Sequence, residues 1–184
     1  MERRSLSERI DSAQSYWVMV VMDVFTRRII GFGVAVANLD GTVICRMFNR
    51  AIAKKTPPRC LSSDHDPLFR FHRWLANLRV LEVDEIKAIP CTPRCTPRSH
   101  AFVERLIGTV RREYLDRTLF WNQSDLQRKL ENYKAYYNQH RCHSGLAGAT
   151  PAQRSGVPPP PMAKLESYSW RQHCKGLFQT PTAA

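Results

Sequence analysis

Two carboxylates in this chain occur in settings that suit phosphoryl-transfer chemistry. Asp64 follows Leu61-Ser62-Ser63, a short segment that predicts a strand ending at the carboxylate. Glu104 lies in the first turns of a predicted helix whose apolar residues recur along one face. Two-metal phosphoryl-transfer sites collect such carboxylates from separate elements around a pair of Mg²⁺ ions. These sites usually hold a third carboxylate, and the sequence offers no convincing candidate for it.

Both carboxylates also have an ordinary structural interpretation, which the residues alone leave open. Asp64 can cap the helix expected after Pro67, because an aspartate at that position accepts a backbone N–H bond. Glu104 can be a solvated carboxylate that pairs with Arg105 or Arg111 on the same helix.

Five basic residues near Glu104 are candidates for contacts with the DNA backbone. Arg94, Arg98 and His100 lie in the expected loop before the Glu104 helix. Arg111 and Arg112 lie two helical turns after Glu104, so they share its face and could meet phosphates. A salt-bridged helix surface is the alternative interpretation for these last two.

The composition favours a polyanionic partner. The chain has 184 residues, a 43% hydrophobic fraction and a formal net charge of +12, which suit one domain plus a tail. An excess of this size indicates nucleic acid first and an anionic membrane second. No apolar run approaches the roughly 20 residues of a membrane span, and no apolar signal core follows the N-terminus. We therefore expect a cytoplasmic protein that does not enter a membrane.

The six cysteines do not indicate a metal centre. Cys91 and Cys95 lie near His100, but no second pair of cysteines has the spacing of zinc ligands. Reduced thiols without a structural role are the expected state in a cytoplasm.

The apolar pattern predicts alternating helices and strands. We expect strands over residues 16–22, 29–36, 60–63 and 85–89, and helices that begin near residues 41, 68, 102 and 124. A hairpin followed by alternating elements predicts an α/β domain with a mixed sheet flanked by helices. We place this domain at residues 1–155. Residues 156–184 begin with a proline run and are predicted to be a flexible tail without a core.

Residues 16–151 resemble the catalytic core of DDE-type integrases and insertion-sequence transposases, which have a ribonuclease H-like fold. Five segments carry the resemblance in the family's order: 16–34, 63–66, 102–114, 136–143 and 150–151. It implies that Asp64 and Glu104 are catalytic residues and ligands of two Mg²⁺ or Mn²⁺ ions. It also implies DNA strand cleavage and strand transfer on mobile-element ends and target DNA, by a homo-oligomer.

Two departures from the family are visible. Residues 91–98 repeat Cys-Thr-Pro-Arg in tandem, and the separation of Asp64 from Glu104 exceeds the family's usual one by about that tetrapeptide. A loop absorbs such an insertion cheaply, because closure entropy grows slowly with length. More seriously, the family's first aspartate should stand on a strand before Tyr16. Residues 1–15 show no strand pattern, and Asp11 is a weak candidate there. Asp23 matches a turn position that is normally non-catalytic.

We therefore expect a core whose first strand is missing or degenerate and whose first catalytic aspartate is absent, so that its activity as an enzyme is uncertain. The leading hypothesis is a truncated and impaired homologue of a transposase or integrase core. A catalytically silent nucleic-acid-binding module is the second hypothesis, and a decayed fragment without a stable fold is the third.

Overall fold

A computed structural model describes residues 2–10, 16–36, 39–63, 66–86, 98–161, 164 and 166–183. Side chains are described for these residues except 2–10 and 98–101. The chain forms two compact units, residues 1–127 and 128–184, and each is described by itself.

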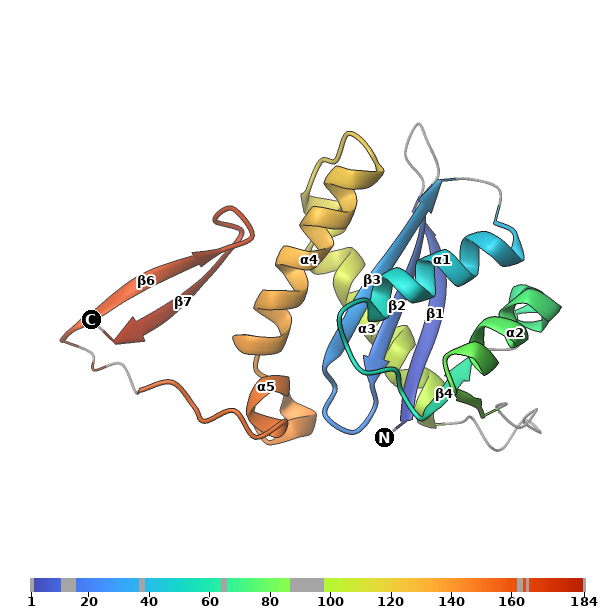
Figure 1. Ribbon diagram of the computed structural model, residues 1–184. Coiled ribbons are helices and arrows are strands. Elements are labelled where there is room, and N and C mark those ends of the chain that lie inside the picture. Colours follow the sequence, from blue (N-terminus) through green and yellow to red (C-terminus); the bar gives the residue numbers. More distant parts are fainter. Residues whose placement is uncertain are drawn as a thin grey trace. The chain divides into compact units, whose positions relative to one another are not determined.

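A five-stranded mixed sheet forms the centre of the first unit (Figure 1). Its strand order is β3-β2-β1-β4-β5, with β1 antiparallel to β2 and parallel to β4. The bounds are β1 (Glu2–Ile10), β2 (Tyr16–Asp23), β3 (Ile29–Val36), β4 (Cys60–Ser63) and β5 (Asp84–Glu85). The predicted mixed sheet and four of its strands are confirmed, although β5 is shorter than expected and residues 87–89 lie outside the described residues.

The prediction that the first strand is missing is wrong. Residues 2–10 form β1, which pairs with β2 on one side and with β4 on the other, at the middle of the sheet. Pairing of this kind uses backbone N–H and C=O groups, which every residue type in Glu2–Ile10 provides. The side-chain pattern of Glu2–Ile10 therefore does not predict a strand, and pairing with β2 and β4 sets its position.

Strands β2 and β3 are buried because almost all their residues are apolar. Helix α1 (Gly41–Ile52) begins where the Asp40 side chain accepts the N–H of Val43 at 2.7 Å. It lies directly against β3, because a Cβ at Gly33 would come within 2.4 Å of the Met47 carbonyl oxygen. Glycine at this position is what allows the helix and the strand to approach so closely.

The two faces of the sheet are covered by different helices. On one face, α1 and α2 (His72–Val80) enclose a cluster that includes Met19, Phe48 and Trp74. The 3-10 helix η1 (Pro67–Arg70) precedes α2 and adds Phe69, whose ring meets that of Trp74 edge-on at 5.1 Å. Residues of the opposite parity on β2 contact α3 (Arg98–Glu113), as the crevice between Val18 and Val110 shows. The short helix η2 (Leu115–Arg117) follows α3.

Helix α4 (Gln123–Gln139) begins in the first unit and continues into the second. Its start was predicted near residue 124, and the side chain of Asn122 accepts the N–H of Asp125 at 2.9 Å there. The side chains of Gln123 and Gln127 then donate to the β3 carbonyls of Val34 and Phe32 at 2.6 and 3.0 Å. These bonds satisfy backbone groups on the outer edge of the sheet.

The predicted flexible tail contains a hairpin, so that prediction is wrong for residues 168–183. Strands β6 (Tyr168–His173) and β7 (Phe178–Ala183) pair antiparallel. The ring of Phe178 stacks on Tyr136 of α4, with 4.1 Å between centroids. The second unit also contains η3 (Ser144–Leu146) and α5 (Pro151–Arg154). In the described part of the chain, no helix has both the length and the apolar character to span a bilayer.

Candidate active site

The end of β4 is built as the sequence predicts, up to the residue before the first candidate carboxylate. Ser62 and Ser63 are buried in the sheet. The hydroxyl of Ser63 donates to Glu85 Oε1 at 2.8 Å, and Glu85 pairs in register with Leu61. Asp64 itself lies outside the described residues, so its catalytic role stays a prediction.

Glu104 is an exposed carboxylate on α3. Its neighbours Val103 and Leu106 are buried at 3% exposure each, so the helix is fixed while Glu104 faces solvent. Within the described residues, Glu104 has no hydrogen bond and no ion pair, which argues against its predicted alternative role as a partner of Arg105 or Arg111. A carboxylate held on a packed helix without a partner is available to a metal ion or solvent.

The basic candidates divide into three groups. Arg98 and His100 belong to the first turns of α3 rather than to a loop, which corrects their predicted placement; their side chains lie outside the description. Arg94 lies outside the described residues altogether. Arg111 and Arg112 are exposed in the last turn of α3. Their roles toward DNA remain predictions.

Two details of α3 concern how these cations are held. Arg111 borders an apolar crevice of about 20 Å³ together with Ile107 and Val110. The guanidinium of Arg112 lies close to Gly108, since a Cβ at that glycine would be 3.0 Å from Arg112 Nη1. Arg112 therefore folds back along the helix, toward the end that carries Glu104.

Arg27 is a residue that the sequence analysis missed. It lies in the turn between β2 and β3, and its guanidinium carbon is 3.1 Å from the centroid of the Phe102 ring on α3. This cation–π contact joins the hairpin to the turn of α3 that carries Glu104. Residues 27 and 102 are far apart in the chain, so no local pattern indicates the contact.

The register of β1 tests whether a third carboxylate is present. Ser5 pairs with Ser63 and Arg4 pairs with Ser62, so Arg4 and Ser5 lie beside the end of β4. Neither is a carboxylate. The acids of β1 are Glu2, which pairs with Cys60, and Glu8, which lies three residues, or about 10 Å, beyond Ser5. The central strand is present, but its positions beside the end of β4 carry no acid.

Asp23 does not replace the missing carboxylate. It is completely buried at the end of β2, where Oδ1 accepts the N–H of Phe25 at 3.0 Å and Oδ2 accepts the hydroxyl of Thr26 at 2.7 Å. These bonds close the turn after β2, as the sequence analysis expected for a non-catalytic position. Asp11 lies outside the described residues.

Part of the predicted two-metal site lies outside this description, namely Asp64 and the side chains of β1. Among the residues whose side chains are described, no group of three His, Cys, Asp or Glu could hold a metal ion. The lack of a third carboxylate beside Asp64 and Glu104 therefore stays a prediction.

Comparisons with known proteins agree with the topology. A family profile described as an integrase core domain matches residues 87–151. A protein of insertion element IS476 from Xanthomonas euvesicatoria, described as uncharacterized, is 24% identical over 146 residues. That alignment covers 79% of this chain and 41% of the relative, so the chain spans less than half of that protein's length.

Several solved structures with a similar fold are integrase catalytic core domains. The HTLV-2 integrase catalytic core domain in complex with magnesium has a TM-score of 0.60 and 15% identity, and the match covers 83% of this chain and 93% of that one. A chain in the structure of the simian T-cell lymphotropic virus intasome in complex with PP2A regulatory subunit B56 gamma gives a TM-score of 0.63 and 18% identity, and the match covers 98% of this chain and 66% of that one. At these identities the likeness shows a shared fold, which is mixed α/β and ribonuclease H-like.

Proposed function

We propose that the chain, which is similar to integrase and transposase catalytic cores, is a DNA integration homologue whose phosphoryl-transfer chemistry is impaired. The reaction of the intact family core would be metal-dependent cleavage and strand transfer on mobile-element ends and target DNA. The present chain keeps the sheet and the helix that position such a site, but lacks one of its carboxylates.

The register of β1 is the observation that carries this proposal. Arg4 and Ser5 pair with the last two residues of β4, and neither can bind a metal ion as a carboxylate would. The impairment follows from the residues that occupy the central strand. It does not depend on where the chain begins.

Two carboxylates can still bind one divalent ion, so metal binding and DNA cleavage should be separable. We expect Asp64 and Glu104 to bind Mn²⁺ or Mg²⁺ weakly through oxygen ligands. Without a third carboxylate, the pair of ions needed to stabilise both the attacking and the leaving oxygen is not assembled. We therefore expect no metal-dependent DNA cleavage by this chain.

A thermal melt with and without millimolar Mn²⁺, combined with a nicking assay, tests the proposal. An ion that binds only the native state at 100 times its Kd adds about 2.7 kcal/mol, which raises the melting temperature by a few degrees. We expect a rise that disappears in Asp64→Asn and in Glu104→Gln, together with no nicking by any of the three proteins. Metal-dependent nicking by the wild-type chain that Asp64→Asn abolishes would refute the impairment.

The net charge of +12 supports a second candidate function, a silent nucleic-acid-binding module. Affinity that comes from phosphate contacts falls steeply as salt rises, because counterions are released on binding. A silent module should bind duplex DNA with a strong salt dependence and show no change in melting temperature with Mn²⁺. Binding that hardly changes between low and moderate salt would exclude it.

A further inference from the structure

The β6–β7 hairpin of the second unit has one face that packs on α4 and one face that is open. Phe178 belongs to the packed face, because its ring stacks on that of Tyr136, and it pairs in register with His173. Side chains alternate along a strand, so Tyr168 and Trp170 lie on the opposite face of β6. They are 42% and 57% exposed, and the hairpin therefore turns two large aromatic rings toward solvent.

The two rings form an apolar corner that also carries hydrogen-bond donors. The rings of Tyr168 and Trp170 are nearly perpendicular, at 86°, with centroids 5.5 Å apart. Pro181 pairs with Trp170 across the hairpin and extends the apolar surface. Among the described residues, none forms a hydrogen bond with the Trp170 indole N–H or the Tyr168 hydroxyl. An exposed apolar patch of this kind is typical of an interaction site.

The open face has no charged side chain, which decides the class of partner that it suits. Arg171 has the opposite strand parity, so the excess of basic residues in the chain does not reach this face. A nucleic acid would need cations here, because phosphate contacts supply much of its affinity. The face therefore suits an uncharged apolar segment that accepts hydrogen bonds. Its residues are Tyr168, Trp170, Gln172, Gln179, Pro181 and Ala183.

The chain itself contains a segment with these properties. Residues 157–161 read Val-Pro-Pro-Pro-Pro and are all exposed. Consecutive prolines favour the polyproline II helix, which has three residues per turn and no internal hydrogen bonds. A run of four prolines therefore has a proline ring on every side, and it extends about 12 Å, which is enough to cover both aromatic rings. Proline has no N–H, so its carbonyl oxygens are free to accept from other groups.

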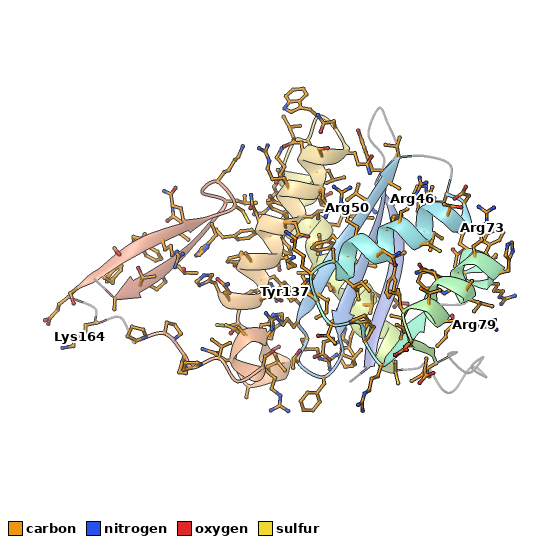
Figure 2. All side chains as sticks on the ribbon, in the orientation of Figure 1. Arg46, Arg50, Arg73, Arg79, Tyr137 and Lys164 are labelled. Atoms are coloured by element: carbon orange, nitrogen blue, oxygen red, sulfur yellow. The ribbon has the colours of Figure 1, made fainter. Side chains whose placement is uncertain are left out.

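We propose that the open face of β6–β7 binds the proline run of a second copy of this chain. Proline rings pack into the corner of Tyr168 and Trp170, whose O–H and N–H groups donate to proline carbonyl oxygens. The run of the same copy does not cover this face, because both aromatic side chains stay exposed although that run is present. A bridge between Lys164 and Ser167 separates the run from β6 (Figure 2). The inference goes beyond the proposed function and depends on neither metal binding nor DNA cleavage.

Titration of the full chain with a synthetic peptide of residues 155–163, followed by calorimetry, tests the open face. We expect saturable binding to the wild type and at least about tenfold weaker binding to Trp170→Ala, because tryptophans dominate contacts of this kind. Trp121→Ala is the matched control, since Trp121 is 82% exposed in the first unit and its loss should leave the affinity unchanged. The same peptide with its four prolines changed to alanine should not bind.

A variant of the proline run tests the second copy without touching the hairpin. The full chain with alanine at residues 158–161 should bind the wild-type peptide as the wild type does, but should self-associate less in sedimentation at equal concentration. Trp170→Ala should self-associate less as well. Both variants should melt at the wild-type temperature once association is taken into account, since the changed side chains are exposed.

Three results would overturn the proposal. The first is a wild type that does not bind the peptide, or binds it no better than Trp170→Ala does. The second is equal self-association of the wild type and the proline-run variant. The third is displacement of the peptide by a single-stranded oligonucleotide that Trp170→Ala no longer binds, because the rings would then stack on bases.

Discussion

Strands β1 and β2 are hydrogen-bonded neighbours, yet the sequence presents them in opposite ways. β2 is almost entirely apolar and buried, so its side chains alone predict a strand. β1 reads Glu-Arg-Arg-Ser-Leu-Ser-Glu-Arg-Ile, which has no strand pattern, and still lies at the centre of the sheet. The comparison shows that one strand is specified by its own residues and the other by its neighbours.

The same comparison separates the fold of this chain from its chemistry. The central strand needs only backbone pairing to keep its position between β2 and β4. A metal site would need a carboxylate beside the end of β4, where Arg4 and Ser5 stand. We propose on this basis that the chain keeps the architecture of an integrase core without one residue that the reaction requires.

The largest expected effect is on the contact between β3 and α1, which depends on close packing and not on backbone pairing between strands. A side chain at Gly33 would meet the Met47 carbonyl within 2.4 Å, so α1 would have to move away from the sheet. Gly33→Val should cost more than about 3 kcal/mol of unfolding free energy. Urea denaturation measures it, with Gly145→Ala as the control, because nothing lies within 4 Å of a Cβ at Gly145. Equal stability of both variants would contradict the close α1–β3 contact.

The next effect concerns β1 itself. Proline at Ser5 removes an N–H from a strand that is paired on both sides, and should cost about 3 kcal/mol. Ser5→Thr keeps the N–H and adds a residue that favours strands, so it should leave the stability within about 0.5 kcal/mol of the wild type. Urea denaturation of the two variants gives the answer. If Ser5→Pro unfolds at the same urea concentration as Ser5→Thr, then β1 is not a central strand.

The smallest effect extends the comparison to β6, a strand held by aromatic and histidine contacts. The rings of His140 on α4 and His173 on β6 lie 4.1 Å apart. Burial lowers the pKa of His140, and His173 and Arg171 lower it further; burial and Arg171 lower the pKa of His173 in the same way. Both groups are partly exposed, so the effect is modest.

A lowered histidine pKa means that the folded state binds protons more weakly than the unfolded one. Stability from this pair is therefore fully present above the ordinary value of 6.5 and is lost as pH falls through the lowered pKa. Melting temperatures between pH 7.5 and pH 5 should fall more for the wild type than for His173→Gln. The same fall in both proteins would show that the His140–His173 contact does not respond to protonation.

Sequence reasoning succeeded where side-chain pattern and structure coincide. Residue type and spacing predicted the apolar strands β2 and β3, the start of α1 near residue 41 and the position of Glu104 on a helix with one apolar face. It failed for β1 and for β6–β7. β1 is fixed by long-range pairing, and the hairpin lies beyond a proline run that suggested a tail.

The candidate site shows the same division between local and long-range information. Glu104 can be located from its own helix, but the contact of Arg27 with Phe102 depends on the folded topology. The level of β1 beside Ser63 likewise becomes visible only in the register of the sheet. The register therefore identifies Arg4 and Leu6 of β1 as positions at which a carboxylate can be introduced by mutation.

Restoring the carboxylate is the most direct test of the central claim. We would measure Mg²⁺- or Mn²⁺-dependent nicking of duplex DNA by the wild type, Arg4→Asp, Leu6→Asp and Ser5→Asp. Successive residues of a strand face opposite sides, so Arg4 and Leu6 share one face of β1 and Ser5 faces the other. The account predicts nicking by Arg4→Asp or Leu6→Asp that also requires Asp64 and Glu104, and none by the wild type or Ser5→Asp. Nicking by the wild type, abolished by Glu8→Gln, would contradict it, because the third carboxylate would then be present already.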